Sequence, residues 1–142
     1  MWLLDTNVVS ECMRAHPAAQ VLAWLDALDE RQVWISAVTS AEIALGLALL
    51  PAGKRKMALQ DAAQAMLEED FAGRCLSFDA EAAKHYGDIV AQRTGLGRPI
   101  SVEDAQIAAI ARSRGLRLAT RNVKDFEQIG GLTLINPWET VA

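Results

Sequence analysis

Short apolar runs alternate along the chain with longer segments in which apolar residues recur at helical spacing. Five runs have the length and composition of buried strands, at residues 2–4, 33–36, 75–78, 116–120 and 132–135. Between them, apolar periodicity predicts helices over residues 17–30 (with Pro17 near the first helical position), 40–50, 54–71, 79–95 and 102–115. Because such alternation is typical of a parallel sheet covered by helices, the pattern predicts an α/β fold.

Length and composition fit one globular domain over residues 1–142, with 51% hydrophobic and 23% charged residues. The longest uncharged apolar stretch, residues 43–50, is followed by Pro51 and is far shorter than the roughly 20 residues that span a bilayer. An acid at position 5 and the lack of a basic residue before Arg14 argue against a secretory signal, so a cytoplasmic protein without a membrane span is expected. Cys12 and Cys75 lack metal-type spacing and are expected to be thiols in or near the core.

The charges are unevenly distributed along the chain. The net charge of −4 argues against a simple basic nucleic-acid-binding domain. Residues 93–124, however, carry seven basic side chains against two acidic ones, a charge of +5, and the rest of the chain carries −9. This segment is either a face that attracts phosphate or an ordinary solvated surface.

Polar side chains from four segments are expected to meet at one edge of the sheet, because ligands of open parallel sheets bind at the carboxyl ends of the strands. Asp5 directly follows the first strand. Glu42 and Asp104 are expected in the first turns of the helices that begin near residues 40 and 101. The segment after the strand at 116–119 supplies Thr120, Arg121 and Asn122.

Each acid also has a purely structural interpretation. The segments 39–42 (Thr-Ser-Ala-Glu) and 101–104 (Ser-Val-Glu-Asp) are similar to capping boxes, in which Glu42 and Asp104 would bond back to the helix N-terminus. Asp5 would be the N-cap of a helix that starts near Asn7. Both interpretations are open for each residue taken alone.

The combination of the three acids favours a metal site. Carboxylates brought together without a cation repel one another at a cost of more than about 1 kcal/mol per pair in a partly dry site. A divalent cation reverses the sign of that interaction. Mg²⁺ takes one or two carboxylates plus water and retains positions for phosphate, which reconciles an acidic protein with a polyanionic substrate.

Several sequence blocks resemble the PIN-domain ribonucleases, and among them the VapC-type toxins of bacterial toxin–antitoxin pairs, in the branch that includes FitB. The blocks are DTNVVS at 5–10, SAVTSAEIALG at 36–46, GRPISVEDAQIAAIA at 97–111, LATRNVKDF at 118–126 and INPW at 135–138. They occur in the family's order and spacing and extend from residue 3 to residue 138.

This resemblance implies a three-layer α/β/α sandwich with a central parallel sheet. It also implies an endoribonuclease that depends on Mg²⁺ or Mn²⁺, that is inhibited by a cognate antitoxin, and that forms a homodimer or a higher assembly with it. The family's acidic positions fall on Asp5, Glu42 and Asp104 as metal ligands. Asn122 stands at the fourth acidic position, with Asp125 nearby, and Thr6 and Thr120 would be hydroxyl supports.

The expected catalytic residues are therefore Asp5, Glu42, Asp104 and Asn122. Asp5 and Asp104 would be the principal metal anchors, and Glu42 would bind the metal directly or orient its water. Asn122 would hold that water or a phosphate oxygen. The RNA backbone would be gripped by Arg98, Arg121 and Lys124, each of which is otherwise an ordinary surface charge.

Two apolar segments, residues 21–30 and 43–50, are either core or an exposed groove for an antitoxin helix or a dimer contact. An antitoxin arginine would suit the acidic pocket. Two alternative functions are open. One is a metal-free binding module for RNA or a protein; the other is a phosphotransfer protein with Asp5 as nucleophile, although Asn7 stands where that chemistry commonly has a second acid.

Overall fold

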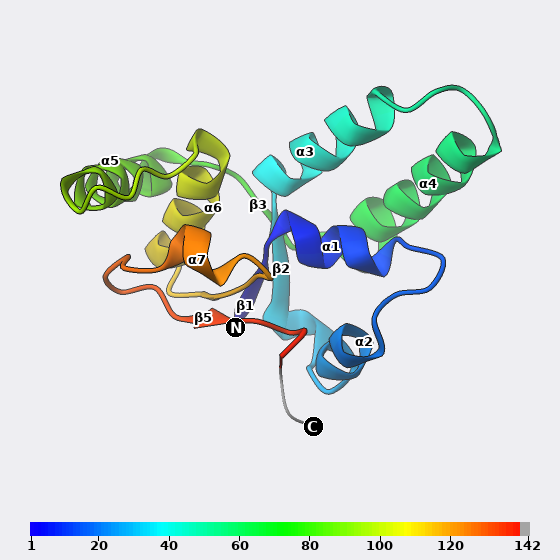
Figure 1. Cartoon of the computed structure of the whole chain (residues 1–142). Helices are drawn as coiled ribbons and strands as arrows, with labels where there is room; N and C mark the ends of the chain where they lie inside the picture. The colour runs from blue at the N-terminus through cyan, green and yellow to red at the C-terminus, as the bar shows by residue number, and fades with distance from the viewer. Residues whose placement is uncertain (140–142) are drawn as a thin grey trace.

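Residues 1–139 are described by the computed structural model, and they form a five-stranded sheet with helices on both faces (Figure 1). The strands are β1 (Trp2–Leu4), β2 (Val33–Ser36), β3 (Cys75–Leu76), β4 (Arg117–Ala119) and β5 (Leu134–Ile135). They pair in the order β3-β2-β1-β4-β5, and every pair is parallel. All five predicted strands exist, but β3, β4 and β5 are shorter than expected.

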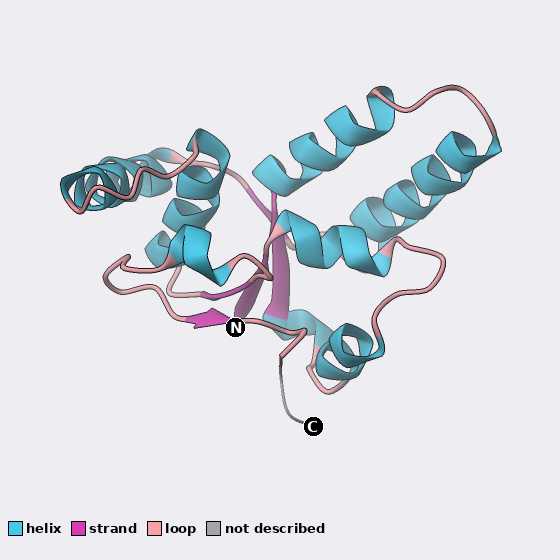
Figure 2. Ribbon diagram, in the orientation of Figure 1, coloured by secondary structure: helices cyan, strands magenta, loops and turns pink. Residues whose placement is uncertain are grey.

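Seven α-helices connect and cover the strands in the described part of the chain, as Figure 2 shows. They are α1 (Thr6–Cys12), α2 (Ala19–Asp26), α3 (Ala37–Ala48), α4 (Lys54–Ala65), α5 (Ala80–Gly95), α6 (Val102–Ser113) and α7 (Val123–Phe126). A 3₁₀ turn, η1 (Glu30–Gln32), precedes β2, and a π-helical turn, η2 (Met66–Asp70), continues α4. Neither α1 nor α7 is among the helices predicted from periodicity.

Two hydrophobic cores lie on opposite faces of the sheet. Leu3 points to one core with Ile89 of α5 and Ile107 of α6, whereas its neighbours on β1 belong to the other core with Val8 and Val21 of α1 and α2. Residues of a strand alternate between faces, so a strand covered on both sides is apolar throughout. The predicted three-layer α/β/α sandwich with a central parallel sheet is confirmed.

The helix expected over residues 17–30 is wrong in its bounds. The chain enters α2 only at Ala19, because the buried Glu11 carboxylate accepts a 2.9 Å hydrogen bond from the amide of Ala18 and fixes the turn before it. Pro17 therefore lies outside the helix. At the other end α2 stops at Asp26, and Asp29 caps the separate turn η1 by accepting from the amide of Arg31.

The helix expected from residue 40 begins three residues earlier, at Ala37. Ser36, the last residue of β2, is its N-cap, since the Ser36 hydroxyl accepts a 3.1 Å hydrogen bond from the amide of Thr39. The sequence 39–42 is therefore not a capping box, and Glu42 lies beyond the first turn. By contrast Ser101 caps α6 as predicted, with its hydroxyl 3.2 Å from the amide of Asp104.

No helix within residues 1–139 is both long and apolar enough to cross a membrane. Both cysteines are free thiols, as expected; Cys12 is partly buried, but Cys75 is exposed rather than near the core. The single domain over residues 1–142 stays a prediction, and its last three residues lie outside the described part.

Candidate active site at the carboxyl ends of the strands

Asp5 occupies the point where β1 gives way to α1, and its side chain is only 4% exposed. One carboxylate oxygen accepts a 2.8 Å hydrogen bond from the amide of Thr6, which makes Asp5 the N-cap of α1. The other oxygen accepts from the hydroxyl of Thr120 at 2.7 Å and from the side-chain amide of Asn7 at 3.2 Å. The capping interpretation of Asp5 is thus correct, and it coexists with the placement of Asp5 at the sheet edge.

Burial raises the pKa of Asp5 to about 6. The hydrogen bonds from Thr120 and Thr6 act in the opposite direction and lower this pKa, while the negative charges of Asp104 and Glu42 raise it. These two acids come from α6 and α3, far from Asp5 in the sequence. The charges of both predicted acids thus act on the Asp5 carboxylate and disfavour its ionised form.

Glu42 is held by a chain of hydroxyl groups instead of a helix N-terminus. The Thr6 hydroxyl donates a 2.8 Å hydrogen bond to Oε1 of Glu42 and lies 3.0 Å from the hydroxyl of Thr39. Thr39 is completely buried and also lies 3.4 Å from the hydroxyl of Ser36. Thr6 thus supports an acid as predicted, whereas the contribution of Thr39 is missing from the sequence analysis because its hydroxyl looked like a helix cap.

Asp104 projects from the first turn of α6 and is half-buried. Burial raises its pKa, the Ser101 hydroxyl lowers it, and the charges of Asp125, Glu42 and Glu103 raise it further. Asp125, which stands on α7, therefore belongs to the same negative environment. Within residues 1–139, none of Asp5, Glu42 and Asp104 forms an ion pair with a basic side chain.

The donor set fits an open divalent-cation site. No three His, Cys, Asp or Glu side chains in the described residues are close enough together to enclose a metal. The carboxylates of Asp5 and Asp104 are nevertheless hard oxygen donors, the charge of Asp104 raises the pKa of Asp5, and within residues 1–139 neither forms an ion pair with a basic side chain. Such a set matches an ion like Mg²⁺, which usually binds one or two carboxylates and keeps several waters.

The segment after β4 contributes backbone and hydroxyl groups to the site. Thr120 is buried, and its hydroxyl accepts a 3.0 Å hydrogen bond from the amide of Asn122. Asn122 itself is exposed, directly before α7. Asn7, which was not among the predicted site residues, joins this segment to α1, because its Oδ1 accepts a 3.2 Å hydrogen bond from the amide of Arg121. The place of Asn7 in the DTN block at residues 5–7 is the sequence feature that could have indicated this contribution.

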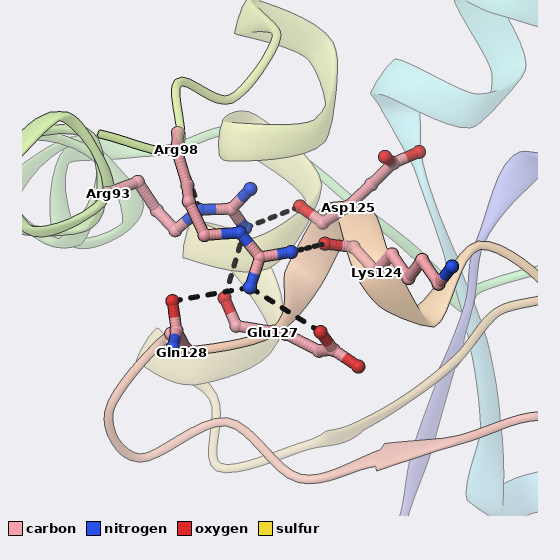
Figure 3. Close-up of polar contacts among 6 residues, drawn as sticks. All are labelled: Arg93, Arg98, Lys124, Asp125, Glu127 and Gln128. Atoms are coloured by element: carbon pink, nitrogen blue, oxygen red, sulfur yellow. Dashed lines mark hydrogen bonds and ion pairs between the residues drawn. The ribbon is translucent and has the colours of Figure 1, made fainter. Parts of the chain in front are cut away.

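Several basic side chains of residues 93–124 serve contacts within the protein, as Figure 3 shows for Arg93 and Arg98. Arg93 is 3% exposed and donates to the carbonyls of Arg98, Asp125 and Glu127 at 2.8, 2.7 and 3.1 Å. It thereby ties the end of α5 to the end of α7.

Arg98, expected to grip RNA, reaches the same segment. Its guanidinium lies 3.2 Å from the carbonyl of Lys124 and 3.5 Å from the carboxylate of Glu127. Arg121 lies over the ring of Trp138, 4.9 Å from its centroid. The side chain of Lys124 extends away from both guanidiniums in Figure 3 and is exposed.

Comparison with known proteins decides the family. The family model of the PIN domain matches residues 2–132. The chain belongs to the PIN domain family. Its PIN domain is 44% identical over 139 residues to VapC ribonuclease Y4jK of Sinorhizobium fredii, which covers 98% of this chain and 99% of that protein. It is 41% identical over 138 residues to Toxin FitB of Neisseria gonorrhoeae, with 97% and 99% covered.

A solved structure extends this likeness to three dimensions. The structure of FitAB bound to an IR36 DNA fragment matches this PIN domain with a TM-score of 0.90 at 39% identity, and covers 100% of this chain and 99% of that one. The resemblance to the VapC-type and FitB-like toxins noted in the sequence is thus confirmed, as is the fold that it implies.

Proposed function

We propose that this PIN domain is a metal-dependent endoribonuclease that uses Mg²⁺ or Mn²⁺, and that it is the toxin of a toxin–antitoxin pair. The observation that carries the proposal is that the charges of Glu42 on α3 and Asp104 on α6 act on Asp5, which follows β1, while none of the three acids forms an ion pair with a basic side chain within residues 1–139. The names of its relatives, VapC ribonuclease Y4jK and Toxin FitB, support this activity and role.

Each residue has a role in the proposed reaction, which is hydrolysis of an RNA phosphodiester bond. Asp5 and Asp104 would hold the cation, and Glu42, oriented by the Thr6 hydroxyl, would bind it or position the attacking water. A bound divalent cation would lower the pKa of that water and would polarise the scissile phosphate. Asn122, exposed beside the site, would contact the water or a phosphate oxygen.

The placement of Thr120 supports this arrangement. Its hydroxyl bonds to Asp5 and accepts from the backbone of Asn122, so the carboxylate stays ionised more easily than burial alone would allow. A carboxylate fixed by hydrogen bonds keeps its geometry while a ligand enters. Thr120 would therefore act through Asp5 and not on the substrate.

The proposed partner is a cognate antitoxin. The FitB relative occurs in a solved FitAB assembly on DNA, and this chain matches a subunit of that assembly over its full length. We infer that this PIN domain forms a comparable assembly, as a homodimer or a larger complex with its antitoxin.

Cleavage of a labelled RNA tests the proposed activity, with a DNA strand of the same sequence as a control. Wild-type protein is expected to cleave the RNA in Mg²⁺ or Mn²⁺ and to lose this activity in EDTA. Asp104→Asn should abolish cleavage. The matched control Asp61→Asn also removes one carboxylate, but from an exposed position on α4, and should cleave normally.

Two outcomes contradict the proposal. Cleavage that persists in EDTA would exclude the metal-dependent mechanism. RNA binding without cleavage under any metal would instead support the metal-free binding module. A phosphotransfer protein would be supported by a trapped phosphoaspartate at Asp5, where the side-chain amide of Asn7 now stands 3.2 Å from the carboxylate.

A further inference from the structure

A cavity leads away from the candidate active site between α1, α3 and α4. It has a volume of about 280 Å³, and its lining includes Thr6, Glu42, Arg14 and Arg55. Helix α1 packs against α3, and α3 packs against α4 (Figure 1). Residues of all three helices line the cavity. The cavity therefore joins a proposed catalytic carboxylate to two basic side chains.

A second cavity of about 440 Å³ continues from the first. It shares Met13, Arg14, Arg55 and Leu59 with the first cavity and extends to His16. We refer to the two cavities together as the α1–α3–α4 groove. Its volume lies in the range of ligand sites, which are typically about 300–1,000 Å³.

The two arginines of this groove are exposed. Arg55 is exposed, and within residues 1–139 its side chain forms no hydrogen bond or ion pair. Arg14 is 65% exposed and lies 3.2 Å from the carboxylate of Glu11. Arg55 thus differs from Arg93 and Arg98, whose guanidiniums are engaged by the backbone of α7 and its neighbours.

Gly46 keeps the groove open along α3. It lies inside the helix and lines the first cavity, although glycine destabilises a helix interior relative to alanine. A Cβ atom at this position would meet no other atom within 4 Å, so packing does not require glycine. A residue that weakens its own helix and faces open space is the kind of local conflict that marks functional sites.

We propose that the α1–α3–α4 groove binds the RNA strand next to the scissile phosphate, with Arg14 and Arg55 contacting its backbone phosphates. The inference rests on the proposed function, because it describes where the RNA substrate would lie as it leaves the proposed catalytic carboxylates. An RNA strand whose scissile phosphate lies at the proposed site carries one more negatively charged phosphate at each neighbouring nucleotide, and these phosphates also need cationic partners. The groove offers Arg14 and Arg55 to these phosphates, and its apolar residues Met13 and Leu59 would contact a sugar or a base.

Binding of a fluorescein-labelled 12-nucleotide RNA tests this path, with EDTA present so that no cleavage occurs. Arg55→Gln is expected to weaken RNA binding by roughly fivefold at 100 mM salt. It should also reduce the slope of log Kd against log salt by about 0.7, which is the contribution of one phosphate contact to a single strand. The matched control is Lys54→Gln, since Lys54 is adjacent and exposed but lines neither cavity of the groove. It should change Kd by less than about twofold.

Filling the groove tests the same path without changing charge. Gly46→Met is expected to raise KM for RNA cleavage severalfold while kcat changes little, because the reacting groups are untouched. Its matched control, Ala44→Met, places the same side chain on an exposed part of α3 that does not line the groove, and should behave as wild type. Circular dichroism of both variants checks that the helix is intact.

The outcomes separate this inference from the proposed function. If wild-type protein cleaves RNA but Arg55→Gln and Gly46→Met behave as wild type, the groove assignment is overturned. If wild-type protein cleaves no RNA while Arg55→Gln still weakens RNA binding, the proposed activity fails and the groove stands. A poly-glutamate peptide is the probe for an acidic protein segment. If it binds wild type as tightly as RNA does and loses affinity equally in Arg55→Gln, the groove is not an RNA site.

Discussion

The hydroxyl of Thr120 donates a 2.7 Å hydrogen bond to Oδ2 of Asp5, which joins the residues that follow β4 and β1. The two strands pair in parallel with Leu4 opposite Ala119, so their next residues emerge side by side at the sheet edge. The amide of Asp5 also donates to the carbonyl of Ala119 at 2.9 Å. The position of the Asp5 carboxylate is therefore set by the register of the sheet.

Replacing Thr120 by valine should weaken the site through Asp5. Thr120→Val removes the donor to Asp5 and the acceptor of the Asn122 amide, so both partners are left short of a hydrogen bond. We expect RNA cleavage to fall roughly 10- to 100-fold, the usual effect of losing a support of a metal ligand. The free energy of unfolding should fall by about 1–3 kcal/mol.

Thr120→Ser is the matched control, because it keeps the hydroxyl and should retain most of the activity. Steady-state kinetics and urea unfolding measure both effects. Wild-type cleavage by Thr120→Val would show that the hydroxyl does not position Asp5.

Asp5→Asn should abolish cleavage and yet stabilise the metal-free protein at neutral pH. Burial raises the pKa of Asp5 in the folded protein to about 6, from 3.8 in an unperturbed chain. Between these values the folded state retains a proton that the unfolded state has lost. Stability due to Asp5 therefore falls as pH rises from about 4 to 6 and stays reduced above 6.

The expected advantage of Asp5→Asn over wild type is about 3 kcal/mol at pH 8 in EDTA, and close to zero at pH 4. Urea unfolding of both proteins over this pH range measures the difference. If wild type were instead more stable than Asp5→Asn at pH 8 without metal, burial would not destabilise the Asp5 carboxylate.

Arg93 should be far more important for stability than its neighbour Arg98. The buried guanidinium of Arg93 donates to three carbonyls, and Arg93→Met would leave those carbonyls without this donor. We expect a loss of roughly 2–5 kcal/mol in the free energy of unfolding. Arg98→Gln removes a partly exposed guanidinium and should cost about 1 kcal/mol or less.

Chemical denaturation of the two variants provides the comparison. Equal, small losses for Arg93→Met and Arg98→Gln would contradict the structural role assigned to Arg93. A reduction in RNA affinity for Arg98→Gln at unchanged stability would restore Arg98 as an RNA contact.

The parts of the fold that local sequence determines were predictable, and the parts that tertiary contacts determine were not. The apolar run at residues 2–4 predicts a buried strand, because the residues on both of its faces are apolar. Ser101 was recognisable from the sequence as a helix N-cap. At the start of α3, however, Ser36, Thr39 and Ser40 are all plausible caps. The choice of Ser36 depends on Thr39 being drawn to the hydroxyl of Thr6, a residue 33 positions away.

The same distinction holds for the site. The acids at positions 5, 42 and 104 follow from strand ends and family blocks, and the effects of Glu42 and Asp104 on the pKa of Asp5 agree with their expected proximity. The sequence suggested a surface position for Arg93, either on a phosphate-attracting face or on an ordinary solvated surface, whereas the structure buries it. No local pattern indicates this burial, because two of the three acceptors of Arg93 are carbonyls of residues 125 and 127, more than 30 positions away.

The central claim is that Asp5 and Asp104 share one divalent cation, and titration of Mn²⁺ followed by electron paramagnetic resonance at pH 7.5 tests it most directly. Wild-type protein should take up one Mn²⁺. Asp5→Asn and Asp104→Asn should each bind it at least about 10-fold more weakly, and Asp61→Asn should bind as wild type does. Equal Mn²⁺ affinity in all four proteins would contradict the claim.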